Sequence, residues 1–223
     1  MIDANDFKHF MRIDVFPEYD IEYYQLDNSA GFAYVGHARY DARSKKHTLL
    51  LPENLNVPRF LLFHEMTHIY DMHRYSKDDR NYDFFLTGYM EYHAAQVELM
   101  VMMGAENIDS KIAFSMKDII NNSEWSVQQY LDDKLDLAKK LVQEIEKQKR
   151  IDGLRAFFNF LGLKSICSMF ATDFKDGYSY GEILERMSTF LLMEIRNEYS
   201  GWIFDIDRAV VLYSQAYAAV ADN

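Results

Sequence analysis

The sequence has few of the residues that build disulfide-linked or turn-rich folds. Its 223 residues include one cysteine, three prolines and nine glycines. A single cysteine excludes an intramolecular disulfide, and Cys167 lies in the apolar run 166–170, where we expect a buried structural thiol. So few prolines and glycines leave little material for a β-sandwich with many tight turns, and a helix-rich fold is therefore favoured.

Positive charge is also scarce, because 24 Lys and Arg face 35 Asp and Glu, which gives a net charge of −11. The densest basic stretch, 139–150, is interleaved with Glu144 and Glu146, which is typical of a solvated helix face. No run of about 18 apolar residues could span a membrane, and the acidic N-terminus lacks an apolar signal segment. We therefore expect a cytoplasmic protein that contacts neither nucleic acid nor membrane.

What is present is a large apolar fraction, 49% of the residues, which is enough for a substantial core. The pattern predicts an α+β fold that is mostly α, with a small antiparallel sheet near the N-terminus. Residues 33–40 and 47–51 are the expected strands of a hairpin with its loop at 41–46, and Ile21–Leu26 is a weaker strand candidate.

From Val57 the apolar period becomes helical. Pro58 suits the first turn of a helix over 59–74, which is apolar almost all round and therefore belongs inside its domain. A second helix is expected over 84–103. The remaining expected helices are an amphipathic one reaching Ile145 with Ser123 or Ser126 as its N-cap, then 153–170, 179–199 and 208–219.

The most specific pattern is His64-Glu65-Met66-Thr67-His68 on the first of these helices. Two histidines four residues apart project from one side of a helix, so both imidazoles can reach one ion. Glu65 leans towards the same ion and can deprotonate a water molecule whose pKa Zn²⁺ has lowered. This is the H-E-x-x-H pattern of zinc hydrolases, in which Glu65 is the general base.

A catalytic zinc needs a third protein ligand, and the second helix offers Glu91, Glu98 and His93. Glu91 is favoured, since Ala94 and Ala95 on its face allow close approach to the metal helix. Glu98 and His93 remain alternatives.

Several further residues are candidates for supporting roles. Asp71 lies on the face of the motif histidines and is expected to accept the second N–H of one of them. A side chain that binds the oxyanion of a reaction intermediate is also expected in such a hydrolase. The sequence leaves four candidates open for this role: Tyr92, Tyr89, Tyr34 and His37.

The segment from about Gly31 to Met103 resembles the gluzincin metallopeptidases, and most closely the ImmA/IrrE-type peptidases. The resemblance rests on the strand ending at Pro52, the His64–His68 motif and Glu91-x-x-Ala94. It implies that His64, His68 and Glu91 bind zinc, that Glu65 is the base, and that the substrate is a protein, such as a repressor-like regulator. It also implies substrate binding in extended form along an edge strand. Here that strand would be formed by His47, Thr48, Leu49, Leu50 and Leu51.

The chain is accordingly expected to divide into a zincin-like metallopeptidase core over 1–105 and a helical subdomain over 106–223. The helical subdomain either completes the cleft or binds a partner. Two functions follow. The first is a zinc-dependent endopeptidase acting on a specific protein. The alternative is a non-catalytic regulatory or protein-binding module that retains the metal site, and a fourth protein ligand from Glu98 or His93 would favour it.

Overall fold

The structure, a computed structural model, describes residues 4–25, 37–53, 56–121, 123–203 and 205–221. They form a small sheet followed by helices, which confirms the predicted mostly helical α+β class. In chain order the elements are α1 (Ala4–Met11), β1 (Tyr19–Tyr24), β2 (His37–Asp41), β3 (Lys46–Pro52), α2 (Arg59–Tyr75), α3 (Arg80–Met102), α4 (Val127–Val142), α5 (Lys147–Phe170), α6 (Gly181–Leu184), α7 (Thr189–Glu198) and α8 (Ile206–Ala221).

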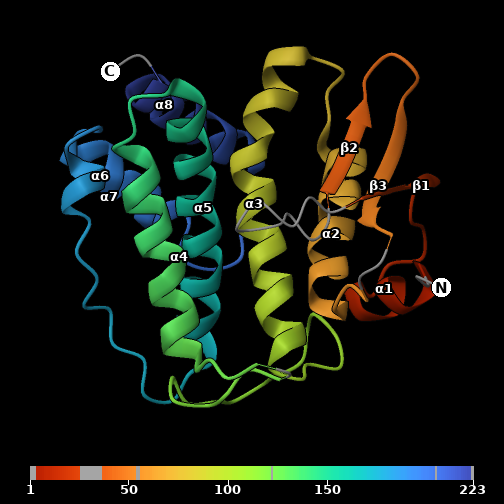
Figure 1. The fold of residues 1–223 in the computed structure, drawn as a ribbon, viewed down its shortest axis with the longest axis horizontal. Coiled ribbons are helices and arrows are strands. Elements are labelled where there is room, and N and C mark those ends of the chain that lie inside the picture. The colour runs from red at the N-terminus through yellow and green to blue at the C-terminus, as the bar shows by residue number, and fades with distance from the viewer. Residues whose placement is uncertain (1–3, 26–36, 54–55, 122, 204, 222–223) are drawn as a thin grey trace.

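The sheet lies at one side of the molecule, and the long helices stand beside it (Figure 1). Helix α2 contacts both the sheet and α3, while α3 contacts α5 and α8, and α5 contacts α4. Helix α3 is therefore covered on several sides, and residues around its whole circumference are buried from Tyr92 to Met102. A polar side chain on this stretch of α3 must find its partners inside the protein.

The sheet differs from the predicted antiparallel sheet in the direction of one strand pairing. Strand β3 pairs antiparallel with β2, which confirms the predicted hairpin, but it pairs parallel with β1. The sheet is therefore mixed, with the order β1-β3-β2. Alternation along a strand indicates which face is buried, but the direction of pairing depends on the connection between strands. Of the predicted strand segments, residues 33–36 and Leu26 lie outside the described residues.

Helix α1 was not predicted, because eight residues carry too short a periodic pattern to be distinguished from a loop. Its Phe7 and Phe10 are completely buried and meet the ring of Phe63 at centroid distances of 5.3 and 5.4 Å. Asp6 accepts a 2.8 Å bond from Arg59 at the start of α2. These contacts hold the beginning of the helix that carries the histidine motif.

The helices α2 and α3 have the predicted character. Helix α2 begins directly after Pro58. Helix α3 begins at Arg80, four residues earlier than predicted, because Asp79 caps it by accepting the backbone N–H groups of Asn81 and Tyr82.

The helices of the C-terminal half have different bounds from those predicted, and α5, for example, begins at Lys147, six residues earlier. Ser126, not Ser123, caps α4, and α4 ends at Val142, so that Ile145 is 94% exposed. The expected helix 179–199 is divided into α6 and α7, because Ser188 starts a new helix by accepting the N–H of Leu191.

The core is continuous across residue 105. One cluster of buried apolar side chains includes residues from Phe7 to Val220. Close contact between α3 and α5 contributes to it, since an ideal Cβ at Gly162 would lie 2.1 Å from the backbone oxygen of Tyr92. The division into residues 1–105 and 106–223 stays a prediction.

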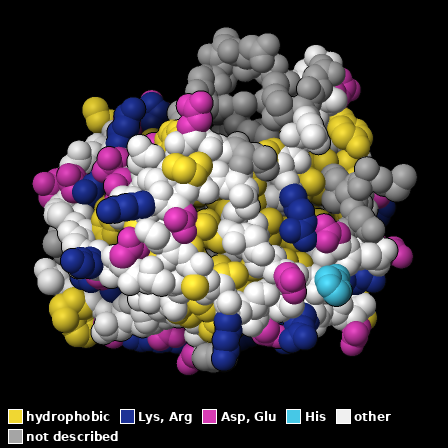
Figure 2. Space-filling view, turned by 90° about the horizontal axis from the view of Figure 1, so that it is seen from below, with side chains coloured by type: hydrophobic (Ala, Val, Ile, Leu, Met, Phe, Trp, Pro, Cys, Tyr) yellow, Lys and Arg dark blue, Asp and Glu magenta, His cyan; other side chains and the backbone are white. Residues whose placement is uncertain are grey.

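Acidic and basic side chains alternate over the face shown in Figure 2, and neither sign forms a continuous patch there. In the described part of the chain, no helix is long and apolar enough to cross a membrane.

Candidate metal centre

Three side chains from α2 and α3 converge on one point. The Nε2 atoms of His64 and His68 lie 3.1 Å apart, and Oε2 of Glu91 lies 3.9 Å from each. The two histidines are one turn apart on α2, and Glu91 comes from the facing side of α3, as its neighbours Ala94 and Ala95 predict. Within the described ranges, these are the residues that could together hold a metal ion.

The donor set and its spacing fit zinc. A tetrahedral Zn²⁺ with bonds of about 2.1 Å would hold its ligand atoms about 3.4 Å apart, which falls between the distances observed here. Two imidazoles and one carboxylate are also a ligand set found in catalytic zinc sites. His64, His68 and Glu91 can therefore bind the ion without a change in the fold.

Glu98 orients His64. Its Oε2 atom lies 2.7 Å from Nδ1 of His64, and because a carboxylate only accepts, Nδ1–H is the donor and Nε2 remains free for a metal. Burial opposes protonation of His64, but the carboxylates of Glu98, Glu65 and Glu91 together raise its pKa to about 9, so Nε2 must release a proton when it binds a metal. The other Glu98 oxygen accepts a short hydrogen bond from the hydroxyl of Tyr130 on α4.

Glu65 is held by the sheet. Its Oε2 atom accepts a 2.8 Å hydrogen bond from the backbone N–H of Ala38 in β2. Burial raises the pKa of Glu65 to about 7, although the positive charge of His64 opposes this shift. A carboxyl group with a pKa near neutrality can both take and return a proton, which is the property that a general base needs.

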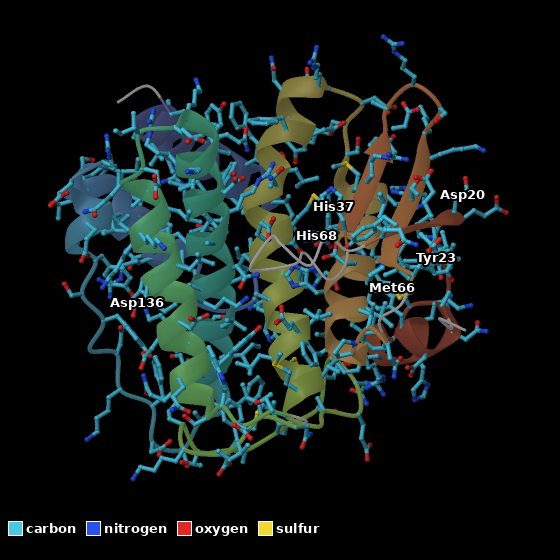
Figure 3. The ribbon with its side chains drawn as sticks, in the orientation of Figure 1. Asp20, Tyr23, His37, Met66, His68 and Asp136 are labelled. Carbon is cyan, nitrogen blue, oxygen red and sulfur yellow. The ribbon has the colours of Figure 1, made fainter. Side chains whose placement is uncertain are left out.

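His68 lies close to His37 at the start of β2 (Figure 3). Burial and the neighbouring charge of His64 lower the pKa of His68 well below its usual value, so His68 is neutral and able to bind a metal. Its Nδ1 atom is buried and has no hydrogen-bond partner among the described residues.

Asp71 is placed differently from the expectation. Its carboxylate is 2.9 Å from Nδ1 of His93, and both residues are buried. The residue that contacts a motif histidine is Glu98, seven residues after Glu91, so it and not Asp71 orients His64. The sequence could not distinguish the two carboxylates, because the choice depends on how α3 is rotated against α2.

The expected substrate strand must also be corrected. Residues His47, Thr48, Leu49, Leu50 and Leu51 lie in β3, which is the central strand, so both of its backbone edges face neighbouring strands. The strand beside the metal helix is β2, whose Ala38 N–H already faces Glu65. A hairpin pattern identifies two strands but does not show that a third strand pairs on the outside.

The four residues that were candidates for binding an oxyanion differ in their surroundings. Tyr92 donates to the carbonyl of Gly201, and Tyr89 lies 3.5 Å from Nδ1 of His93, so both hydroxyls contact groups other than the metal ligands. Tyr34 lies outside the described residues. His37 is the candidate that lies close to His68, at the start of β2.

Sequence reasoning missed two residues near the centre, Tyr130 and Arg155, which come from α4 and α5. Tyr130 has no sequence signal, since it lies at the edge of an ordinary amphipathic stripe. Arg155 does have one, because it is an isolated cation within the apolar run 154–158.

Comparison with known proteins adds no relative: no family model, curated protein or solved structure matches the chain. The assignment of a metal-binding group therefore depends on the geometry of His64, His68 and Glu91 alone.

Proposed function

We propose that the protein is a zinc-dependent endopeptidase that hydrolyses a peptide bond in a specific protein substrate. The observation that carries the proposal is the position of Glu65. Its carboxylate is held against the Ala38 amide by a 2.8 Å bond, and Glu65 directly follows His64, one of the three converging residues, in the sequence. A purely structural metal site has no need for a buried carboxylate that is held in place by a backbone amide next to a metal-binding residue.

The roles of the chain's own residues follow from this arrangement. His64, His68 and Glu91 would hold the ion, and Glu98 keeps His64 in the tautomer that binds it. When bound, Zn²⁺ lowers the pKa of a water ligand and polarises a substrate carbonyl. Glu65 would accept a proton from water at its carboxylate and then donate it to the departing amine nitrogen.

Glu98 and His93 could have supplied a fourth protein ligand, but each has another partner. This favours the peptidase over a regulatory module whose metal has four protein ligands. Glu98 contacts Nδ1 of His64 and not the point of convergence, while His93 is bonded to Asp71. With three protein ligands, one position remains for water or substrate.

The family and the substrate are part of the same proposal. The His64–His68 motif followed by Glu91 supports a gluzincin of the ImmA/IrrE type, and this likeness favours a repressor-like regulatory protein as the substrate. Edge strand β2, beside the metal helix, is the strand we propose for pairing with an extended substrate.

The test is proteolysis by zinc-loaded protein. Wild type, Glu65→Gln and the control Glu106→Gln at an exposed acid are incubated with a denatured proteome, and new peptide termini are identified by mass spectrometry. We expect cleavage by wild type and the control, and loss of about 10²–10⁴-fold in Glu65→Gln with zinc retained. Equal cleavage by Glu65→Gln, or none by zinc-loaded wild type, would contradict the proposal.

A further inference from the structure

One cation from the C-terminal helices acts on the metal-binding residues. Arg155 belongs to α5, and its positive charge favours ionisation of Glu91 and opposes protonation of His68 and His37. These three residues come from α3, α2 and β2, so Arg155 lies where the elements around the metal centre meet.

The packing of α8 on α3 explains this position. An ideal Cβ at Gly88 would lie 2.2 Å from Cδ2 of Tyr213, so the Tyr213 ring lies directly on the backbone of α3. Gly88 is three residues before Glu91 and therefore on the same face of α3. Arg155 lies two turns before Gly162 on α5 and therefore shares the face of α5 that packs on Tyr92 and Ala95 of α3, next to Glu91 in the sequence of that helix. Its charge also acts on the Tyr213 side chain.

The guanidinium of Arg155 has donors that the protein does not use. Its Nε atom is buried and has no hydrogen-bond partner among the residues that the structure describes. The ion pair recorded for it, with Asp152, is 3.8 Å long, whereas a direct charge-assisted hydrogen bond measures about 2.7–2.9 Å. About 38% of the Arg155 side chain is exposed, and since Nε itself is buried, a ligand would meet the guanidinium at its terminal Nη groups.

The nearby carboxylates are engaged by other groups. Glu98 accepts from His64 and Tyr130, Glu65 accepts from the amide of Ala38, and Glu91 belongs to the metal group. Arg155 therefore keeps a positive charge and free N–H groups beside the site where chemistry is proposed. A buried donor without a partner destabilises the protein unless a ligand satisfies it.

We propose that Arg155 binds a carboxylate of the substrate beside the bond to be cleaved. This inference rests on the proposed peptidase function and adds a substrate class to it. The planar guanidinium matches a carboxylate in shape and charge and can bind it through two hydrogen bonds. An Asp or Glu side chain fits the proposed endopeptidase, whereas a peptide C-terminus at this place would make the enzyme a carboxypeptidase.

The first experiment measures binding without turnover. Zinc-loaded protein is titrated with monohydroxamates of succinic, glutaric and adipic acid, in which the hydroxamate binds the metal and the free carboxylate can meet Arg155. The matching neutral amides are the reference compounds. At one chain length or more, we expect the carboxylate to bind about 10- to 100-fold more tightly than its amide.

Three variants assign this preference to Arg155. We expect it to fall to about 2-fold or less in Arg155→Gln and to be reduced in Arg155→Lys, which keeps the charge but loses the planar fork. The matched control is Arg208→Gln, whose arginine is 40% exposed and bonded to Glu194 on α7, and it should keep the full preference.

Each contrary result has a distinct meaning. Equal binding of acid and amide by wild type, a preference retained in Arg155→Gln, or loss of zinc from Arg155→Gln would each overturn the role of Arg155. Failure of zinc-loaded wild type to bind any hydroxamate would instead overturn the proposed function, because it would remove the open metal position, and the inference would fall with it.

A second experiment distinguishes the two sources of the carboxylate. Zinc-loaded Glu65→Gln is titrated with fluorescent peptides that carry either a free C-terminus without acidic side chains or an amidated C-terminus with one internal Glu. Tighter binding of the first than of its amide indicates recognition of the C-terminus. Tighter binding of the second than of its Gln counterpart indicates an acidic side chain, and no difference in either pair would overturn the inference.

Discussion

The Nδ1 atom of His64 lies 2.7 Å from a carboxylate oxygen of Glu98, seven residues beyond Glu91 of the candidate metal group on the same helix. This contact connects α2 to α3 behind the metal centre, and Tyr130 extends the connection to α4. The C-terminal half thus takes part in shaping the candidate metal centre through Tyr130, which is not one of its three converging residues.

Replacing Glu98 should weaken metal binding. In Glu98→Gln the carboxylate no longer orients His64, and we expect zinc affinity to fall about 10- to 100-fold, as measured by competition with a chelator. Tyr130→Phe should have a smaller effect in the same direction, since it removes one hydrogen bond to Glu98. Glu106→Gln is the control, and zinc affinity that is unchanged in Glu98→Gln would contradict this role.

Glycine 162 should be required for the contact between α3 and α5. Alanine normally favours a helix over glycine, but a Cβ here would lie 2.1 Å from the Tyr92 carbonyl oxygen. We expect Gly162→Ala to lower the free energy of unfolding by about 1–3 kcal/mol in urea denaturation. Gly177→Ala, where no described residue other than the chain neighbours lies within 4 Å of the added Cβ, should change it by less than about 0.5 kcal/mol. Equal effects at both positions would be inconsistent with the close approach of the two helices.

Stability should depend on pH through His47. Burial and the facing His73 lower its pKa from 6.5 to about 4, and its ring lies against Tyr40. The folded protein therefore holds His47 neutral, so its contribution is present above about pH 6.5 and is lost as pH falls towards 4. Linkage gives a loss of about 2 kcal/mol between pH 7.5 and 5.

The measurement for His47 is the free energy of unfolding at pH 7.5 and pH 5 for wild type and His47→Phe. The variant should lose less stability on acidification than wild type does. Substitution of the exposed His9 by Asn is the control. The same pH dependence in wild type and His47→Phe would show that other groups cause the effect.

Cys167 should be unreactive in the folded protein. It is completely buried, and burial raises the pKa of its thiol to about 12, so thiolate is scarce at neutral pH. Ellman's reagent should label it slowly under native conditions and label one thiol per chain in denaturant. Rapid labelling of the native protein would contradict the buried position.

The sequence predicted the features that depend on residues close together in the chain. The period of apolar residues predicted α2 and α3, and the spacing of His64 and His68 predicted that their Nε2 atoms meet. The small residues beside Glu91 correctly favoured that residue for the group that the structure brings together.

What the sequence did not predict depends on packing between elements. The choice of Glu98 over Asp71 as the partner of His64 is decided by the rotation of α3 against α2. The central position of β3 depends on a parallel pairing with β1 that no alternation of residues encodes. Arg155 reaches the centre because Gly88 and Gly162 allow α8 and α5 to lie close to α3, which is a property of the assembled fold.

The most direct test of the account is the metal content of protein purified without added metal, measured by elemental analysis. Wild type should contain about one zinc per chain, since the structure places one group of three ligands together. His64→Ala and Glu91→Ala should lose the zinc, whereas Glu65→Gln should keep it, because Glu65 contacts Ala38 and is not one of the three ligands. Wild type that holds no zinc even when zinc is supplied would contradict the central claim.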